Sequence, residues 1–158
     1  MIDTYTVSFF GHRSIDNLFS LEKGLEKIIS GLMWEKGYIE FLVGRDGDFD
    51  RLVASTIRRC KKSVRDDNSA LVWVLPYPTA EFRDNEQFFH DYYDEIEIFS
   101  GSSKTHFKSA FQARNRSMAD RSHLVVFCVE RMEGSAYQTL RYVEKKEIPF
   151  INLREIKT

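Results

Sequence analysis

The stretch TVSFFGHR, Thr6 to Arg13, decides how the rest of the chain is interpreted. It has the pattern of an apolar strand that ends on a glycine and delivers a histidine and an arginine into the loop before a helix. In alternating α/β chains, ligands bind at the carboxyl ends of the strands. Residues 41–50 (FLVGRDGDFD) and 124–139 (LVVFCVERMEGSAYQT) have the same arrangement. Three such strand ends predict one shared cleft.

The remaining elements follow from the spacing of apolar residues. Short continuous apolar runs bounded by glycine or proline are typical of strands buried on both faces of a parallel sheet. Apolar residues three and four apart indicate helices. Strands are expected at residues 5–10, 39–43, 70–75, 95–99, 124–129 and 149–153, and helices at 18–34, 49–64, 86–93, 104–119 and 135–146. This alternation predicts a three-layer α/β sandwich with a mostly parallel central sheet.

The composition sets the class of protein. The chain has 158 residues, of which 42% are hydrophobic and 30% charged, so we expect one domain over residues 1–158. No apolar run approaches the roughly 20 residues that a membrane span needs, and no signal segment is evident at the N-terminus. We therefore expect a cytoplasmic protein with no membrane partner.

Charge and metal-binding residues narrow the possible partners. The formal net charge is −1, whereas broad nucleic-acid binding needs a basic face, so nucleic acid is not expected as a partner. A small anionic ligand held by a few arginines remains compatible with this charge. Cys60 and Cys128 show no paired spacing and are expected to be buried thiols. No histidine has metal-ligand spacing, so we expect no metal and no resident cofactor.

Glycines follow three of the predicted strands. A glycine there lets a ligand approach the backbone, and the next helix offers free N–H groups to an anion. These glycines are Gly11, Gly44, Gly47 and Gly134. Tight turns are the alternative explanation for each. Neither GxGxxG nor GxxxxGK[ST] is present, so neither an ordinary dinucleotide site nor a P-loop is predicted.

The turn GSAYQT is a candidate phosphate site. The N–H groups of Ser135 and Ala136, with the hydroxyls of Ser135 and Thr139, are suitable donors for a phosphate. In the alternative interpretation, Ser135 only caps the helix.

Several charged residues are candidates for ligand contacts. Arg114 and Asn115 share a helix face with Phe111 and Met118, so Arg114 is expected to point into the cleft, where an arginine suits bidentate phosphate contacts. A salt bridge to an acid is the alternative. His12 fits a general acid or base, or a contact to a ribose or base. A structural or solvated histidine is the alternative there.

The acids of residues 46–50 have two possible uses. Asp50 is expected to cap the second helix, while Asp46 or Asp48 faces the cleft and could bind a ribose hydroxyl.

At this point the chain resembles a known group. The runs that carry the resemblance are FFGHR, FLVGRDGDFD, VLPY, ARNRSMADRSHLVVF and GSAYQTLRYVEKKEIPFINL. In order and spacing they are similar to the Rossmann-like SLOG superfamily, which includes YpsA-like proteins, DprA and the LOG phosphoribohydrolases. The likeness is greatest to the YpsA-like proteins. It implies a Rossmann-like fold and a nucleotide or nucleotide-derived ligand over the strand ends.

The resemblance also implies ligand-binding residues. Those in the first and second loops are Gly11, His12, Arg13, Gly44, Gly47 and Asp50, and those in the later motifs are Arg114, Asn115, Gly134, Ser135 and Thr139. Arg45 replaces the second glycine of the family's second loop and changes the size or charge of the pocket. LOG enzymes have a PGGxGTxxE turn with a catalytic glutamate, whereas this chain has EGSAYQTL.

These observations leave three functional hypotheses. The first is a domain that binds or senses a nucleotide-like ligand without chemistry. The alternative is a hydrolase of N-glycosidic bonds in nucleotides, which needs a carboxylate near the sugar, from Asp46, Asp48, Asp50 or Glu133. A DprA-like nucleic-acid protein is the least favoured, because of the charge. A homodimer is possible, with contacts from aromatic residues such as Phe19, Trp34 or Tyr142 unless these are core.

Overall fold

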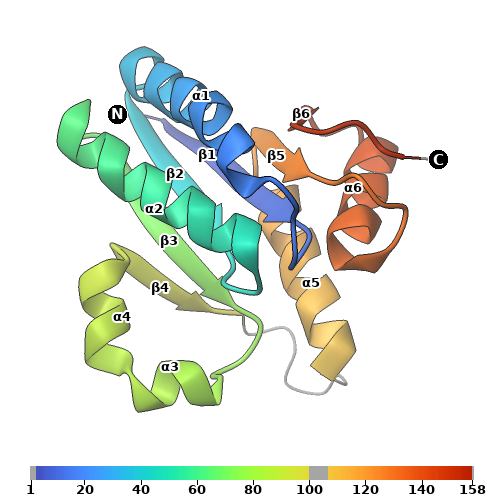
Figure 1. Cartoon of the computed structure of the whole chain (residues 1–158). Helices are drawn as coiled ribbons and strands as arrows, with labels where there is room; N and C mark the ends of the chain where they lie inside the picture. Colours follow the sequence, from blue (N-terminus) through green and yellow to red (C-terminus); the bar gives the residue numbers. More distant parts are fainter. Residues whose placement is uncertain (1–2, 100–106, 158) are drawn as a thin grey trace.

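The computed structural model describes residues 3–99 and 107–157, and the side chains of residues 107 and 108 are outside this description. The strands are β1 (Thr4–Gly11), β2 (Tyr38–Val43), β3 (Ser69–Leu75), β4 (Glu95–Ile98), β5 (Leu124–Cys128) and β6 (Phe150–Asn152). The helices are η1 (Leu18–Leu21, a 3-10 turn), α1 (Glu22–Glu35), α2 (Asp48–Ser63), α3 (Ala80–Asp84), α4 (Glu86–Tyr92), α5 (Phe107–Asp120) and α6 (Gly134–Lys146). Figure 1 shows this alternation of strands and helices along the chain.

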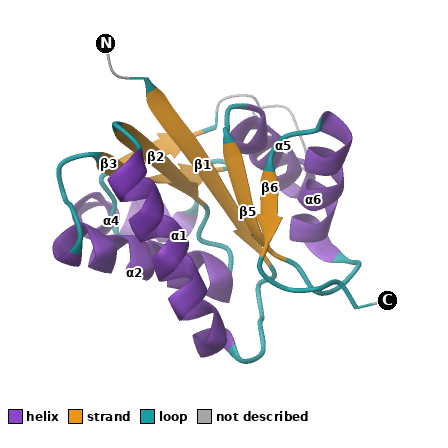
Figure 2. Cartoon of the chain, turned by 90° about the horizontal axis from the view of Figure 1, so that it is seen from above, coloured by secondary structure: helices purple, strands orange, loops and turns teal. Residues whose placement is uncertain are grey.

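The strands form one sheet with the order β4-β3-β2-β1-β5-β6. Every neighbouring pair is parallel. Helices α1, α2 and α4 lie on one side of the sheet and α5 and α6 on the other (Figure 2). The predicted three-layer, Rossmann-like α/β fold is therefore confirmed, with a sheet that is parallel throughout the described strands.

Two buried clusters hold the layers together. Phe9, Phe41 and Phe49 belong to the cluster between the sheet and α1, α2 and α4. Phe127 and Leu140 belong to the cluster under α5 and α6. The central strands bury both faces, which explains why their sequences are continuous apolar runs rather than alternating ones. Cys60 and Cys128 are both buried, as expected.

Two helical segments are more complex than expected. The helix expected at residues 18–34 begins as the 3-10 turn η1 and becomes α-helical at Glu22. The short helix expected at 86–93 is present as α4, and a second short helix, α3, precedes it; Thr79 caps α3, and Asn85 interrupts the helical backbone before α4. Residues 104–106 of the helix expected at 104–119 lie outside the described residues.

The strand order places a crevice at the carboxyl edge of the sheet. From β1 the chain adds strands outward to β4 and then returns to place β5 against the other side of β1. The loops after β1 and β5 therefore lead to helices on opposite faces, which is where open α/β sheets bind ligands. Across the described residues, no helix combines the length and apolarity needed to span a membrane.

Candidate functional site

Gly11, at the end of β1, lies tightly against the second helix. A Cβ atom on Gly11 would stand 2.5 Å from the ring of Phe49, which is fully buried at the start of α2. This glycine therefore permits the packing of helix on strand. Its role as a point of ligand approach remains a prediction.

His12 holds the loop that follows β5. Its Nε2 atom accepts hydrogen bonds from the backbone N–H groups of Glu130 and Arg131, both at 3.1 Å. Burial lowers the pKa of His12, and the charge of Arg131 acts in the same direction. An accepting Nε2 requires a neutral ring, so His12 joins the first and fifth strand ends in its uncharged form. This is the structural alternative considered for it above.

Arg13 is the cation left free at this edge. Its side chain is exposed and forms no hydrogen bond or ion pair with any residue that the structure describes. It lines a recess of about 560 Å³ that extends to Arg131, Gly134 and Ser135 at the start of α6. A guanidinium placed there is available to an anionic group.

The start of α6 borders the same recess. Its N-cap residue is Glu133, whose side chain does not accept a hydrogen bond from the first N–H groups of the helix. Gly134 adopts φ +90° with open space around it, a conformation that favours glycine. Ser135 is exposed inside the first turn and does not cap the helix. Uncapped N–H groups at a helix start attract anions.

The loop after β2 is built against the loop after β1. A Cβ atom on Gly47 would lie 2.3 Å from the Cα atom of Arg13. The N–H of Asp48 donates to the carbonyl of Arg13 at 2.8 Å. Gly47 thus allows two strand-end loops to touch, and it holds the backbone of Arg13 in place.

Arg45 turns away from the recess toward the third and fourth helices. Its guanidinium lies 3.4 Å from Glu81, donates to the Tyr93 hydroxyl at 3.4 Å and covers the ring of Phe89 at 5.0 Å. Arg45 thereby fixes α3 and α4 beside the β2 loop.

Arg114 is buried and fully engaged within the protein. Its Nη2 atom donates to Asp46 Oδ2 at 2.6 Å, and its Nη1 atom donates to the carbonyl of Val74 at 3.2 Å. Both Nε and Nη2 also donate to Asn115 Oδ1. The prediction that Arg114 points toward the strand ends fits this position, and the ion pair considered as its alternative is present. A phosphate contact by Arg114 remains a prediction.

The same hydrogen-bond network continues to the sixth helix. Asn115 Nδ2 donates to Thr139 Oγ1 at 3.2 Å, and Thr139 Oγ1 donates to the carbonyl of Ser135 at 2.9 Å. Thr139 is fully buried. These side chains tie α5 to the first turn of α6 and so position its N–H groups.

Asp50 is a buried carboxyl group at the centre of the site. Its Oδ2 atom accepts the N–H of Asp46 at 2.9 Å, so Asp50 does not cap α2 as expected; Gly47 is the N-cap. Burial, with the adjacent charge of Asp46, raises the pKa of Asp50 to about 7. Arg114 and the hydrogen bond from Asp46 oppose this shift. A carboxyl with such a pKa exchanges protons near neutral pH.

A small cavity separates Asp50 from the recess. It has a volume of about 20 Å³, enough for one water molecule, and Gly44, Asp46, Asp50 and Arg114 form its floor. A Cβ atom on Gly44 would be only 3.2 Å from both carboxylates. Gly44 therefore keeps this cavity open; the approach of a ligand to its backbone remains a prediction.

Asp50→Asn should change how stability depends on pH. A raised carboxyl pKa means that the folded protein holds a proton that the unfolded chain has lost, so stability falls as pH rises from about 4 to about 7. The asparagine variant lacks this loss. We expect it to gain at least about 1 kcal/mol relative to the unsubstituted protein across that range, measured by urea unfolding at a series of pH values. The contribution of His12 to the pH dependence is common to both proteins and cancels in the comparison. If the difference in their free energies of unfolding stayed constant between pH 4 and 8, it would contradict the raised pKa of Asp50.

Sequence reasoning missed Arg131 and Glu130 as parts of this edge. Glu130 is buried; burial opposes its ionisation, but the hydrogen bond from Arg154 and nearby positive charges lower its pKa overall. Arg131 donates to the carbonyl of Ser14 at 3.2 Å. Both follow β5 directly, so the rule that singled out His12 and Arg13 after β1 would have found them.

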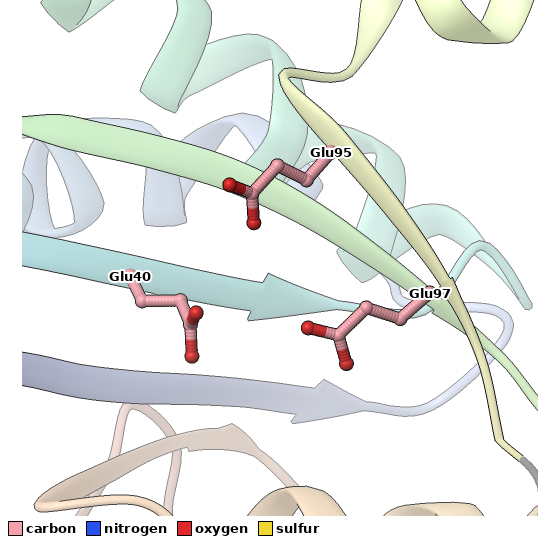
Figure 3. A group of neighbouring side chains, drawn as sticks. All are labelled: Glu40, Glu95 and Glu97. Carbon is pink, nitrogen blue, oxygen red and sulfur yellow. The ribbon is translucent and has the colours of Figure 1, made fainter.

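A separate acidic group lies on the sheet. The carboxylates of Glu40 on β2 and of Glu95 and Glu97 on β4 lie within 4.8 Å of one another (Figure 3). Arg121 contacts Glu97 at 2.9 Å and Glu40 at 3.6 Å. Burial, with the two neighbouring carboxylates, raises the pKa of Glu40 against the opposing effect of Arg121. The ion pairs with Arg121 account for two of these three acids, Glu40 and Glu97.

Comparison with known proteins gives structural likenesses only. No family model matches the chain, and no curated protein matches its sequence. The DNA processing protein A (DprA) of Streptococcus pneumoniae superposes with a TM-score of 0.66 at 17% identity, over 93% of this chain and 49% of that one. The chain shares the fold of DprA. It spans about half the length of that relative.

Two further solved structures agree. DprA of Helicobacter pylori, described by its single-stranded DNA binding mode, gives a TM-score of 0.64 at 15% identity, over 97% of this chain and 68% of that protein. The structural-genomics target TM1055 gives 0.63 at 15% identity, over 95% of this chain and 74% of the other. These likenesses support the Rossmann-like α/β fold.

Proposed function

We propose that the chain binds a nucleotide or nucleotide-derived phosphorylated ligand at the carboxyl ends of its parallel strands, as a relative of the YpsA-like proteins. The observation that carries this proposal is the unpaired, exposed Arg13 beside the uncapped start of α6. A cation and a set of free N–H groups that face one recess suit a phosphate group.

The other residues of the site have supporting roles in this proposal. Arg13 and the N–H groups of Ser135 and Ala136 hold the phosphate. Gly134 lets the ligand approach the backbone. His12, Arg114, Asn115 and Thr139 fix the loops and the helix that present these donors. Gly44 gives access to the two carboxylates below, which are suited to ribose hydroxyls.

Nucleoside monophosphates should raise the melting temperature of the protein, and Arg13→Ala should remove about half of this effect or more. A ligand at a hundred times its dissociation constant stabilises by about 2.7 kcal/mol, which raises Tm by roughly 5 to 10 °C in a protein of this size. Loss of a charge-assisted hydrogen bond should weaken binding about tenfold or more. The measurement is thermal unfolding with a panel of monophosphates, cyclic nucleotides and ADP-ribose.

Arg51→Ala is the matched control, because Arg51 is also an exposed arginine without an ion-pair partner among the described residues. It should leave the ligand effect unchanged. The proposed site would be contradicted if Arg13→Ala and Arg51→Ala weakened the stabilisation by nucleotides equally, or if no phosphorylated nucleotide stabilised the protein.

Hydrolysis of an N-glycosidic bond is a second candidate, favoured by one observation. Asp50, with its pKa near 7, borders a cavity large enough for one water molecule. Such a carboxylate is suited to take a proton from water as the water attacks the sugar carbon. The two candidates are separated by analysing the same samples for free base and phosphosugar.

Nucleic acid also deserves a test as a partner. One relative is described by its binding of single-stranded DNA, so the expectation against nucleic acid has no support from the comparisons.

A further inference from the structure

The outer face of α5 and α6 carries a basic recess of about 1260 Å³. Its polar lining includes Arg116, Arg141, Lys145, Lys146 and the rings of Tyr137 and Tyr142. Glu144 is the one acid among the described residues that line it. This concentration of positive charge is unusual for a chain whose formal net charge is −1.

The recess continues into a second one of about 610 Å³ between the two helices. The two share Arg116 and Gln138 in their linings. The second recess reaches Arg13 and Ser135 at the edge of the sheet. Together they form a groove, called here the α5–α6 groove, that extends from the outer face of α6 to the edge of the sheet.

Most cations of this groove are not neutralised by the protein. Arg116, Lys145 and Lys146 have no ion-pair partner among the described residues, and Arg141 lies 3.9 Å from Glu144. Exposed pairs at such a distance contribute little. The groove therefore presents several positive charges to an outside anion.

Two tyrosine rings lie between these charges. Arg116 Cζ lies 5.3 Å from the centre of the Tyr142 ring, and Lys146 Nζ lies 5.7 Å from it. Asp120 accepts a hydrogen bond from the Tyr142 hydroxyl at 2.6 Å, and Arg141 donates to the Tyr137 hydroxyl at 3.0 Å. Both rings are thus held in place on the surface, half-buried against the helices.

We propose that the α5–α6 groove binds single-stranded nucleic acid. Interspersed cations and anchored aromatic rings match a chain that alternates phosphates with flat bases. A duplex keeps its bases stacked inside, so its bases could not stack on the two tyrosine rings. An acidic peptide has negative charges but no regular series of flat rings that could stack on them. The groove meets the proposed phosphate site at Arg13 and Ser135. Its other cations and its two tyrosines lie outside that site, so the proposal does not rest on nucleotide binding.

The test is fluorescence anisotropy with labelled single strands of DNA and of RNA, each of about 20 nucleotides, and a duplex of the same length. The double variant Arg116→Glu/Lys145→Glu is compared with Lys23→Glu/Lys27→Glu. The latter reverses two exposed lysines on α1 and changes the net charge by the same amount. We expect the groove variant to lose at least tenfold in affinity and the α1 variant to lose less than threefold.

The salt dependence gives an independent measure. Each phosphate contact on a single strand contributes about 0.7 to the slope of log affinity against log salt, so the groove variant should lower that slope by about 1.4. Tyr137→Ala should weaken binding about tenfold, while Tyr137→Phe, which keeps the ring, should not.

Each outcome decides the proposal. The proposal is supported if the protein binds a single strand more tightly than the duplex and the groove variant loses this affinity. The comparison of DNA with RNA shows which kind of single strand the groove prefers. No binding of any single strand, or equal losses in the two double variants, would overturn it. The stabilisation by mononucleotides should be unchanged in the groove variant. A failure of the groove proposal can therefore be distinguished from a failure of the proposed nucleotide site.

Discussion

Arg114→Ala should lower the free energy of unfolding by about 3 kcal/mol or more, measured by urea denaturation. The reason is that Arg114 is buried and its removal leaves a carboxylate, an amide oxygen and a backbone carbonyl without their donor. These belong to Asp46, Asn115 and Val74. Removing one partner of a buried, hydrogen-bonded charge pair is among the most destabilising single changes.

Arg116→Ala is the control for this prediction. Arg116 lies two positions further along α5, is exposed, and should change stability by less than about 0.5 kcal/mol. A variant at Arg114 that unfolds like the unsubstituted protein but no longer binds nucleotides would show instead that Arg114 contacts the ligand. A loss of binding in a destabilised variant does not by itself identify a ligand contact.

Gly47→Ala should destabilise the protein by about 3 kcal/mol, because the added Cβ meets backbone that cannot move aside easily. The new atom would lie 2.3 Å from the Cα atom and 2.6 Å from the carbonyl oxygen of Arg13. The backbone of Gly47 is extended, so the clash, and not its torsion angles, causes the loss. Urea denaturation measures the effect.

Gly24→Ala is the matched control, since it adds the same atom where nothing lies within 4 Å. Gly24 is inside α1, where alanine is preferred, so this variant should be more stable by about 0.5 to 1 kcal/mol. If both alanine variants changed stability in the same direction, the close packing of the first two loops would not be the cause.

The order of strands and helices could be predicted because a strand that is buried on both faces of the sheet has a continuous apolar sequence. Runs such as residues 70–75 and 124–128 are apolar without interruption. The 3-10 turn at the start of the first helical segment could not be predicted, because the spacing of Leu18 and Leu21 also fits an α-helix. Phe19 and Trp34 were left open as core or contact residues, and both are exposed.

The edge that holds the candidate site was also predictable, but the use of its residues was not. Strand ends of a parallel sheet meet, so His12, Gly44 and Arg114 were expected to be near one another. Which side chains pair depends on contacts between distant positions, such as Arg114 with Asp46, that local spacing does not specify. Arg114 is buried and paired with Asp46, whereas Arg13 is exposed and has no ion-pair partner among the described residues, and only the folded chain shows that difference.

The hydrogen bonds that run from Asp46 through Arg114, Asn115 and Thr139 to Ser135 give the crevice a fixed width. They join the loop before α2, on one face of the sheet, to the first turn of α6 on the other. A hinge between the two helical layers would have to break this buried chain of contacts, since packed polar networks do not stretch gradually. A ligand at this edge would therefore meet a rigid template, and we expect it to be selected by the shape and charge that the edge already has.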